Sequence, residues 1–311
     1  MDVKMITHTD MDGIGCAIVM RCVEPATEVF FCNYNDLSKT INHVLNLIEE
    51  EHNERGTLIM SDIAPNKPED VELLDNFSKY NTYALCVLDH HVTAARLNYR
   101  NWAKITPTKD GIPTSGTEMV FDEYRDILEE SLSEEQIEVL KRFVTLVRDY
   151  DTWRWVDTGS EGQYAKKMND LFYMIDRQKF MDWALTNIYS RKLDLPFGEY
   201  ERLVKYREDA RDSYINGKEK TLIDTTLCGK YTFGVVFAEE FISDLGNQLA
   251  ERHPEYDGIA IVCGRSVSLR TVKDDVDVST IAQFYGGGGH PKASGFPIGD
   301  KMEDILKVIF G

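Results

Sequence analysis

Three short segments, far apart in the chain, each place acidic residues and histidines directly after an apolar, β-prone run. They are His8-Thr9-Asp10-Met11-Asp12-Gly13, Asp62 at the end of Leu-Ile-Met-Ser-Asp, and Asp89-His90-His91. An open parallel sheet gathers the carboxyl ends of its strands along one edge, and ligands bind there. Carboxylates and imidazoles crowded at one edge would repel one another and lose hydration unless cations held them together. The pattern therefore predicts a metal cluster.

The mixture of imidazole and carboxylate ligands favours a hard to borderline divalent ion, manganese before magnesium, with zinc third. Two ions about 3.5–4 Å apart would clamp a phosphoryl group and lower the pKa of a bridging water. An Asp-rich turn that only caps a helix is the alternative for the first segment, since Asp is common at N-caps. A surface loop is the alternative for Asp89-His90-His91, although a neighbouring carboxylate commonly orients an imidazole ligand.

A second kind of site is predicted near the C-terminus, where four glycines directly precede His290. Consecutive glycines leave backbone amides free to converge on an anion, and the imidazole adds a donor. Arg270, at the end of a predicted strand, and Ser294 would complete a pocket for a phosphate or a carboxylate. A flexible loop is the alternative for the glycine run.

Length and composition indicate a soluble protein of two domains. The chain has 311 residues, of which 42% are hydrophobic and 28% charged, and one core rarely organises so many. No apolar run approaches the roughly 20 residues of a membrane span, and no signal-peptide pattern precedes the first strand. The six cysteines lack CxxC spacing, so we expect free thiols in a reducing cytoplasm. Since no apolar run is long enough to span a membrane, we expect no membrane partner.

The net charge of −18 limits the partners of the chain. An acidic surface repels a long polyanion, whereas binders of long duplexes normally carry a basic stripe. We therefore expect a small or short phosphate ligand, held locally by metals, arginines and backbone amides.

Strand and helix patterns alternate through the first half of the chain, which is typical of a parallel sheet with helices on both faces. Predicted strands end at Ile6, Cys32, Met60 and Leu88, with helices over 13–22, 38–51 and 68–79. Thr114-Ser115-Gly116-Thr117-Glu118 has the pattern of a hydroxyl-capped helix start. Further helices are predicted over 134–147 and 169–187.

The second half is predicted to form a smaller α/β domain. A charge-rich segment over 199–215 is typical of a helix that bridges domains. Strands over 231–237, 258–263 and 266–271 and a helix over 242–253 follow it. The predicted division is residues 1–188 for a metal-binding catalytic domain, 189–220 for a helical linker and 221–311 for a substrate-binding domain.

The order of these motifs resembles the DHH phosphoesterase superfamily. It runs His-Thr-Asp-Met-Asp-Gly, Ser-Asp, Asp-His-His, Arg-Asp-Tyr-Asp-Thr-Trp and Gly-Gly-Gly-Gly-His-Pro-Lys-Ala-Ser-Gly, over nearly the whole chain. More narrowly, it resembles the branch with a DHHA1 C-terminal domain, as in the nanoRNase and oligoribonuclease proteins of the NrnA and NrnB type. The resemblance implies a doubly wound DHH domain joined to a smaller α/β DHHA1 domain.

The resemblance also implies a role for each motif residue. His8 and Asp10 would bind one metal, Asp12 and His90 the other, and Asp62 would bridge both. Asp89 would orient an imidazole, and His91 would act as leaving-group acid or phosphate contact.

One further metal-binding carboxylate is ambiguous, because the chain offers both Asp149 and Asp151. Relatives tend to have an aromatic residue four positions after this ligand, which Trp153 matches for Asp149, so Asp149 is favoured. The substrate phosphate would be held by residues of the second domain: Arg270, Gly287, Gly288, Gly289, His290 and Ser294.

The implied activity is a manganese-dependent, cytoplasmic phosphoesterase that hydrolyses short RNA or DNA oligonucleotides to mononucleotides. Dephosphorylation of a 3′-phosphoadenosine nucleotide and cleavage of a cyclic or linear dinucleotide are alternative activities. A nucleotide-binding sensor without turnover is the non-enzymatic alternative, and a structural metal scaffold would leave the glycine run without a purpose. The oligomeric state stays open, with a homodimer among the options.

Overall fold

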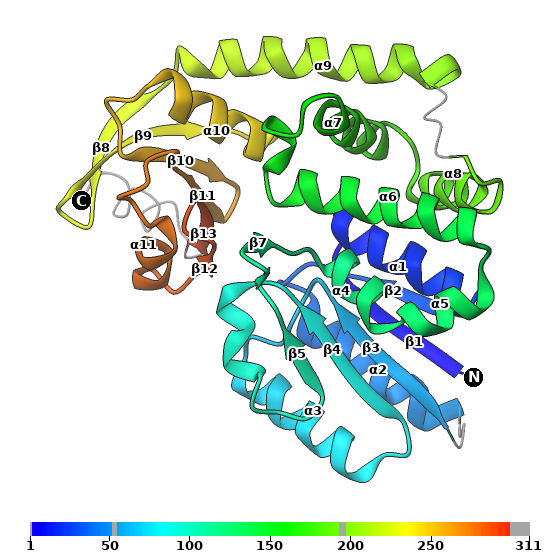
Figure 1. The fold of residues 1–311 in the computed structure, drawn as a ribbon. Coiled ribbons are helices and arrows are strands. Elements are labelled where there is room, and N and C mark those ends of the chain that lie inside the picture. The colour runs from blue at the N-terminus through cyan, green and yellow to red at the C-terminus, as the bar shows by residue number, and fades with distance from the viewer. Residues whose placement is uncertain (1, 52–54, 193–196, 299–311) are drawn as a thin grey trace. The chain divides into compact units, whose positions relative to one another are not determined.

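A computed structural model describes residues 2–51, 55–192 and 197–298 (Figure 1). The chain divides into two compact units, Met1–Val204 and Lys205–Gly311. The functional division at residues 188 and 220 stays a prediction. Residues 193–196 of the predicted linker and 299–311 of the predicted second domain lie outside the described residues.

The first unit contains the predicted parallel sheet. Its strands are β1 (Asp2–Thr7), β2 (Glu28–Phe31), β3 (Gly56–Ser61), β4 (Ala84–Asp89) and β5 (Ala103–Ile105), in the order β2-β1-β3-β4-β5. Neighbouring strands run parallel, and the register pairs Thr7 with both Phe31 and Ser61. The C-terminal ends of β1, β2 and β3 therefore lie level at one sheet edge. The short strand β5 was not predicted.

Helices cover both faces of this sheet (Figure 1). Val3 and Met5 face a core with helix α1 (Met11–Val23), whereas Ile6 faces a second core with α2 (Leu37–Glu51) and α3 (Pro68–Tyr80). This alternation is what a strand buried on both faces requires. The predicted arrangement of helices on both faces is confirmed.

The remaining elements of the first unit include a short helix that follows β4 and several helices that pack on the α1 side of the sheet. They are η1 (Val92–Leu97), the hairpin β6 (Thr108–Lys109) and β7 (Ile112–Pro113), α4 (Gly116–Glu123), α5 (Arg125–Ser131), α6 (Glu134–Asp151), η2 (Arg154–Val156), α7 (Gly159–Met174) and α8 (Arg177–Tyr189). Ser115 caps α4 as predicted. The segment 169–187 forms parts of two helices, because Asp176 caps a new helix by accepting a hydrogen bond from the Gln178 amide.

The second unit builds a mixed sheet. After α9 (Phe197–Glu219) come β8 (Ile223–Leu227), β9 (Tyr231–Phe237), α10 (Ile242–Arg252), β10 (Gly258–Cys263), β11 (Ser266–Arg270), α11 (Val278–Phe284), β12 (Gly288–Gly289) and β13 (Ala293–Pro297). The order is β12-β13-β11-β10-β9-β8, and among these described strands β9 and β10 pair in parallel while the other neighbours pair antiparallel. The predicted strands β9, β10 and β11 and helix α10 are confirmed, whereas β8, α11, β12 and β13 were not predicted.

Two broader expectations can be compared with the structure. No helix in the described parts of the chain is both long enough and apolar enough to cross a membrane. All six cysteines are free thiols, and Cys16, Cys22 and Cys32 are buried. The expectation of unpaired cysteines is therefore confirmed.

Candidate metal centre

The first acidic segment forms a tight turn between β1 and α1. Asp10 is the N-cap of α1, and its carboxylate accepts a hydrogen bond from the Gly13 amide at 3.0 Å. A Cβ at Gly13 would lie 2.2 Å from the His8 carbonyl oxygen, so only glycine allows this approach. The turn thereby keeps His8, Asp10 and Asp12 together at the sheet edge, as the strand-end pattern predicted.

One group of potential ligands joins this turn to the end of β3. His8 Nδ1 lies 2.7 Å from Asp10 Oδ2 and 3.9 Å from Asp62 Oδ2. One atom from each of His8, Asp10 and Asp62 falls within 4.8 Å of the others, close enough to share an ion.

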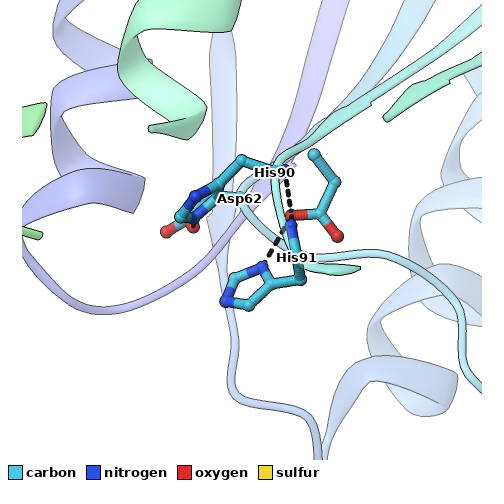
Figure 2. Close-up of side chains that lie close together, drawn as sticks. Asp62, His90 and His91 are labelled. Carbon is cyan, nitrogen blue, oxygen red and sulfur yellow. Dashed lines mark hydrogen bonds and ion pairs between the residues drawn. The ribbon is translucent and has the colours of Figure 1, made fainter. Parts of the chain in front are cut away.

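A second group surrounds His90, which follows β4. Its Nε2 atom lies 3.7 Å from Asp12 Oδ2 and 3.6 Å from Asp151 Oδ2. His90 Nε2 also lies 3.4 Å from Asp62 Oδ1. Asp62 therefore stands next to both groups, and Figure 2 shows it close to His90 and His91 at the strand ends.

The carboxylate near His90 comes from Asp151, not from Asp149, which the sequence favoured. Asp149 is buried, and its Oδ1 accepts a hydrogen bond from Arg148 Nη2 at 2.9 Å. Arg154 Nε lies 3.6 Å from the same oxygen. Two guanidinium groups thus compensate the charge of Asp149, which leaves the position near His90 to Asp151.

Helix phase explains why these two aspartates differ. Residues two apart on an α-helix point about 200° away from each other. The buried residues of α6 include Leu146, Val147 and Asp149, whereas Asp151, at the C-terminal end of the helix, is exposed. The two side chains therefore point to different sides of α6, and it is Asp151 Oδ2 that lies 3.6 Å from His90 Nε2.

The residues present fit divalent ions. Asp62 is buried, and its Oδ2 accepts no hydrogen bond from the residues that the structure describes. Burial and the nearby Asp10 and Asp12 raise the pKa of Asp62 well above its ordinary value. Asp62 also adopts a left-handed backbone with φ 55°, a strained conformation that tends to occur at functional sites. A cation would supply the partner that this oxygen and these crowded carboxylates lack.

Asp89 and His91 belong to the same cluster, because one atom from each of Asp62, Asp89, His90 and His91 lies within 4.8 Å of the others. Asp89 is fully buried, and its Oδ1 lies 2.7 Å from His91 Nδ1 and accepts the His90 backbone N–H at 2.8 Å. Burial lowers the pKa of His91, but Asp89 outweighs this effect and raises it to about 9. The His91 side chain is 26% exposed. The contact with Asp89 thus favours the protonated form of His91, and its partly exposed ring can reach a ligand.

Tyr34 lines the same edge but was missed by the sequence reasoning. Its ring centroid lies 6.1 Å from that of His8 and 6.4 Å from that of His91. Burial raises its pKa, and the nearby Asp89 and Asp62 raise it further. Tyr34 follows β2, so a strand-end rule that also included tyrosines would have selected it.

The predicted anion pocket lies within the second unit. The register of β11 and β13 pairs Arg270 with Ala293, and His290 exchanges backbone hydrogen bonds with Ala293 across the hairpin turn. Arg270 donates to Ser243 Oγ at 3.0 Å. Burial lowers the pKa of Arg270 to about 10. No carboxylate lies within ion-pair distance of Arg270 among the residues described, so its charge is available to an anion.

The glycine run differs from the expected free loop. Gly288 and Gly289 form β12 and pair with β13, and the amides of Gly287 and His290 donate to Ala282 and Ala293 carbonyls. These amides already donate to carbonyl groups of the second unit, so they cannot all converge on an anion. Ser294 is buried, and its hydroxyl donates to the Val278 carbonyl at 2.6 Å, which ties β13 to α11.

Comparison with known proteins gives one extensive sequence relative. The oligoribonuclease NrnB of Bacillus subtilis (strain 168) is 31% identical over 312 residues, which span 97% of this chain and 74% of that protein. No protein-family model matches the chain.

Solved structures share the fold. The DHH domain of a member of a ribosomal-protein family superimposes with a TM-score of 0.65 at 14% identity, covering 99% of this chain and 85% of that one. RecJ from Thermus thermophilus, solved in complex with Mn²⁺, gives 0.61 at 13% identity, covering 98% of this chain and 51% of that one. At these identities the structures establish the architecture, a DHH-type α/β unit followed by a second sheet unit.

Proposed function

Because the chain belongs to the NrnB-type oligoribonuclease family of DHH phosphoesterases, we propose that it is a metal-dependent phosphodiesterase. Its substrates are short oligonucleotides, which it hydrolyses to mononucleotides in the cytoplasm. The observation that carries the proposal is the position of Asp62, whose carboxylate stands within 4 Å of both His8 and His90. Two ligand groups that meet at one carboxylate suit a pair of ions acting on one phosphate.

The two groups divide the ligands between two ions. His8 and Asp10 would hold one ion, Asp12, His90 and Asp151 the other, and Asp62 would contribute to both. Mixed imidazole and carboxylate donors favour manganese, with magnesium second. When bound, the ions would neutralise charge on the phosphoryl group and lower the pKa of an attacking water.

His91 is the proposed general acid. Asp89 keeps it oriented and protonated through the contact at 2.7 Å. A protonated imidazole can donate to the oxygen that leaves when the phosphodiester bond breaks. Tyr34, next to His8 and His91, bounds the space in which this oxygen would lie.

The second unit is proposed to bind a substrate phosphate. Arg270 carries a positive charge without a carboxylate partner among the described residues. Ala293 pairs with Arg270 in the sheet and exchanges backbone hydrogen bonds with His290. Gly289 has φ 136°, and a Cβ there would lie 2.6 Å from Ser294 Cα, so the glycine lets the two strands approach. The proposed pocket offers few fixed cations and the chain has a net charge of −18, so we expect a ligand with few phosphates.

A substrate panel tests the activity. We expect rapid Mn²⁺-supported hydrolysis of RNA of about two to five nucleotides and slow hydrolysis of a strand of about 24, because a long polyanion is repelled by the acidic chain. The panel also contains a 3′-phosphoadenosine nucleotide and a cyclic dinucleotide, since either could be the preferred substrate of this site. A preference for the long strand, or full activity in excess chelator, would contradict the proposal. Binding of all substrates without turnover would identify a sensor.

A matched pair of variants tests the ligand assignment. Asp151→Asn should lower the Mn²⁺ content of the purified protein, because it removes a carboxylate beside His90. Asp149→Asn should leave the content unchanged, because Asp149 contacts arginines. The reverse result would restore Asp149 as the ligand.

A further inference from the structure

The start of α4 makes three hydrogen bonds to one residue, Asp12. The Gly116 amide donates to Asp12 Oδ2 at 2.6 Å, and the Thr117 amide donates to Oδ1 at 2.8 Å. The Thr117 hydroxyl donates to the Asp12 backbone carbonyl, also at 2.8 Å. Asp12 and Thr117 are both buried, so water does not compete for these bonds. Both the side chain and the backbone of Asp12 are therefore fixed.

These bonds suit a carboxylate that also binds a cation. Each carboxylate oxygen has two acceptor positions, and one amide occupies only one of them. We propose that the N-terminus of α4 holds Asp12 in the geometry that binds the ion, and that Thr117 is its positioning residue. The inference rests on the proposed function, in which Asp12 is a metal ligand.

The same turn also contacts the proposed bridging ligand. A Cβ at Gly116 would lie 2.6 Å from the Cβ of Asp62, so the glycine backbone packs directly against that residue. The start of α4 thus touches Asp12 by hydrogen bonds and Asp62 by packing. One element therefore contacts two proposed ligands, Asp12 in α1 and Asp62 directly after β3.

A chain of charged contacts connects this element to the third ligand segment. Glu118, in the first turn of α4, accepts a hydrogen bond from Arg148 Nη1 at 3.1 Å. Arg148 also donates to Asp149 at 2.9 Å, and Asp151 lies half a turn further along α6. Asp149 thus contacts α4 indirectly, through Arg148.

Three substitutions at Thr117 isolate its hydroxyl. Thr117→Ser keeps the hydroxyl and loses the methyl group, Thr117→Ala loses both, and Thr117→Val keeps the shape and loses the hydroxyl. The Ser and Ala variants share the same missing methyl group, so their difference reports the hydrogen bond to Asp12. Thermal unfolding in chelator shows whether each metal-free variant is folded.

The readout is Mn²⁺ affinity, measured by equilibrium dialysis with electron paramagnetic resonance of the free ion. We expect Thr117→Ala and Thr117→Val to weaken the binding of one ion by about 10- to 100-fold, as for other groups that support metal ligands. Thr117→Ser should bind both ions with nearly the affinity of the wild type. Unchanged affinity in the Ala and Val variants would overturn the inference, and equal losses in all three would assign the effect to packing.

The same titration separates this inference from the proposed function. If the wild type binds two Mn²⁺ ions and the variants do not differ from it, only the role of Thr117 is wrong. If the wild type binds no Mn²⁺, the proposed metal-dependent activity fails, and the positioning role fails with it.

Discussion

The two candidate sites require ligands of opposite charge. In the first unit, Asp12, Asp62 and Asp151 crowd around one imidazole, and burial raises the pKa of Asp62 and Asp151. In the second unit, burial lowers the pKa of Arg270, which has no carboxylate within ion-pair distance among the described residues. The first site therefore favours cations, and the second favours an anion. A nucleotide phosphate suits either site, through metal ions in the first unit and directly through the guanidinium in the second.

The largest expected effect comes from Asp62. Asn tolerates the left-handed backbone of this position, so Asp62→Asn removes charge with little strain. We expect loss of both ions and a fall in activity of at least about 10³-fold, the upper end for loss of one electrostatic group. Metal analysis and initial rates are the measurements. Because the second unit is proposed to bind phosphate through Arg270 and not through metal ions, inorganic phosphate should still bind the second unit of this variant.

His91→Ala should separate catalysis from metal binding. A general acid contributes about 10²- to 10⁴-fold to kcat, whereas neither proposed ion depends on His91 as a ligand. The variant should therefore retain its Mn²⁺ content while kcat falls. Asp89→Asn is the companion variant, because it removes the carboxylate that keeps His91 protonated. An unchanged kcat in His91→Ala would remove the acid role.

Arg270→Met should act on substrate affinity. Loss of a hydrogen bond to a charged group costs about 1.5–3 kcal/mol, which corresponds to roughly a 10- to 150-fold rise in KM. Metal content should not change, and kcat should change less than KM. Arg270→Lys should recover part of the affinity, because it restores the charge without the planar guanidinium. A selective fall in kcat would place Arg270 at the reaction centre and weaken the contrast between the two sites.

The smallest expected effect concerns His253, a histidine of the second unit that contacts two glutamates and has no proposed role in either candidate site. Hydrogen bonds to Glu255 and Glu219 raise its pKa above its ordinary value of 6.5. Protonated His253 therefore stabilises the fold fully below that ordinary value, and this contribution is lost as pH rises through the raised pKa. His253→Asn should lower the free energy of unfolding at about pH 6 by less than about 1 kcal/mol, and by nothing at high pH. Urea titrations at both pH values measure this, with activity unchanged.

The sequence predicted well which residues gather at the sheet edge, because one local rule governs their positions. Each ligand segment follows a β-prone run, and parallel strands must bring those ends together. His8, Asp62 and His90 could therefore be grouped without any knowledge of tertiary contacts. The choice between Asp149 and Asp151 relied on a pattern of relatives, and it favoured the aspartate that the structure pairs with arginines, because no local rule indicates which side chain reaches His90.

The second unit was harder to predict because its details depend on pairing between distant strands. The glycine run suggested free amides, but Gly288 and Gly289 pair with β13, which itself was not predicted. The side chain of Ser294 likewise donates to Val278 in α11. No periodicity in a run of glycines indicates which carbonyl each amide will meet. The position of Arg270 at a strand end, by contrast, followed from local alternation and was predicted.

The glycines of the helices have a consequence for engineering heat resistance. Replacing a helical glycine by alanine commonly stabilises a protein by about 0.4–1 kcal/mol. At Gly217 in α9, an added methyl group would meet nothing within 4 Å, so that gain is available. At Gly13 and Gly116 the same methyl group would collide with His8 and Asp62. Replacing every helical glycine by alanine would therefore disturb the segments that position the proposed metal ligands. A replacement restricted to α9 would raise thermal stability and leave those segments intact.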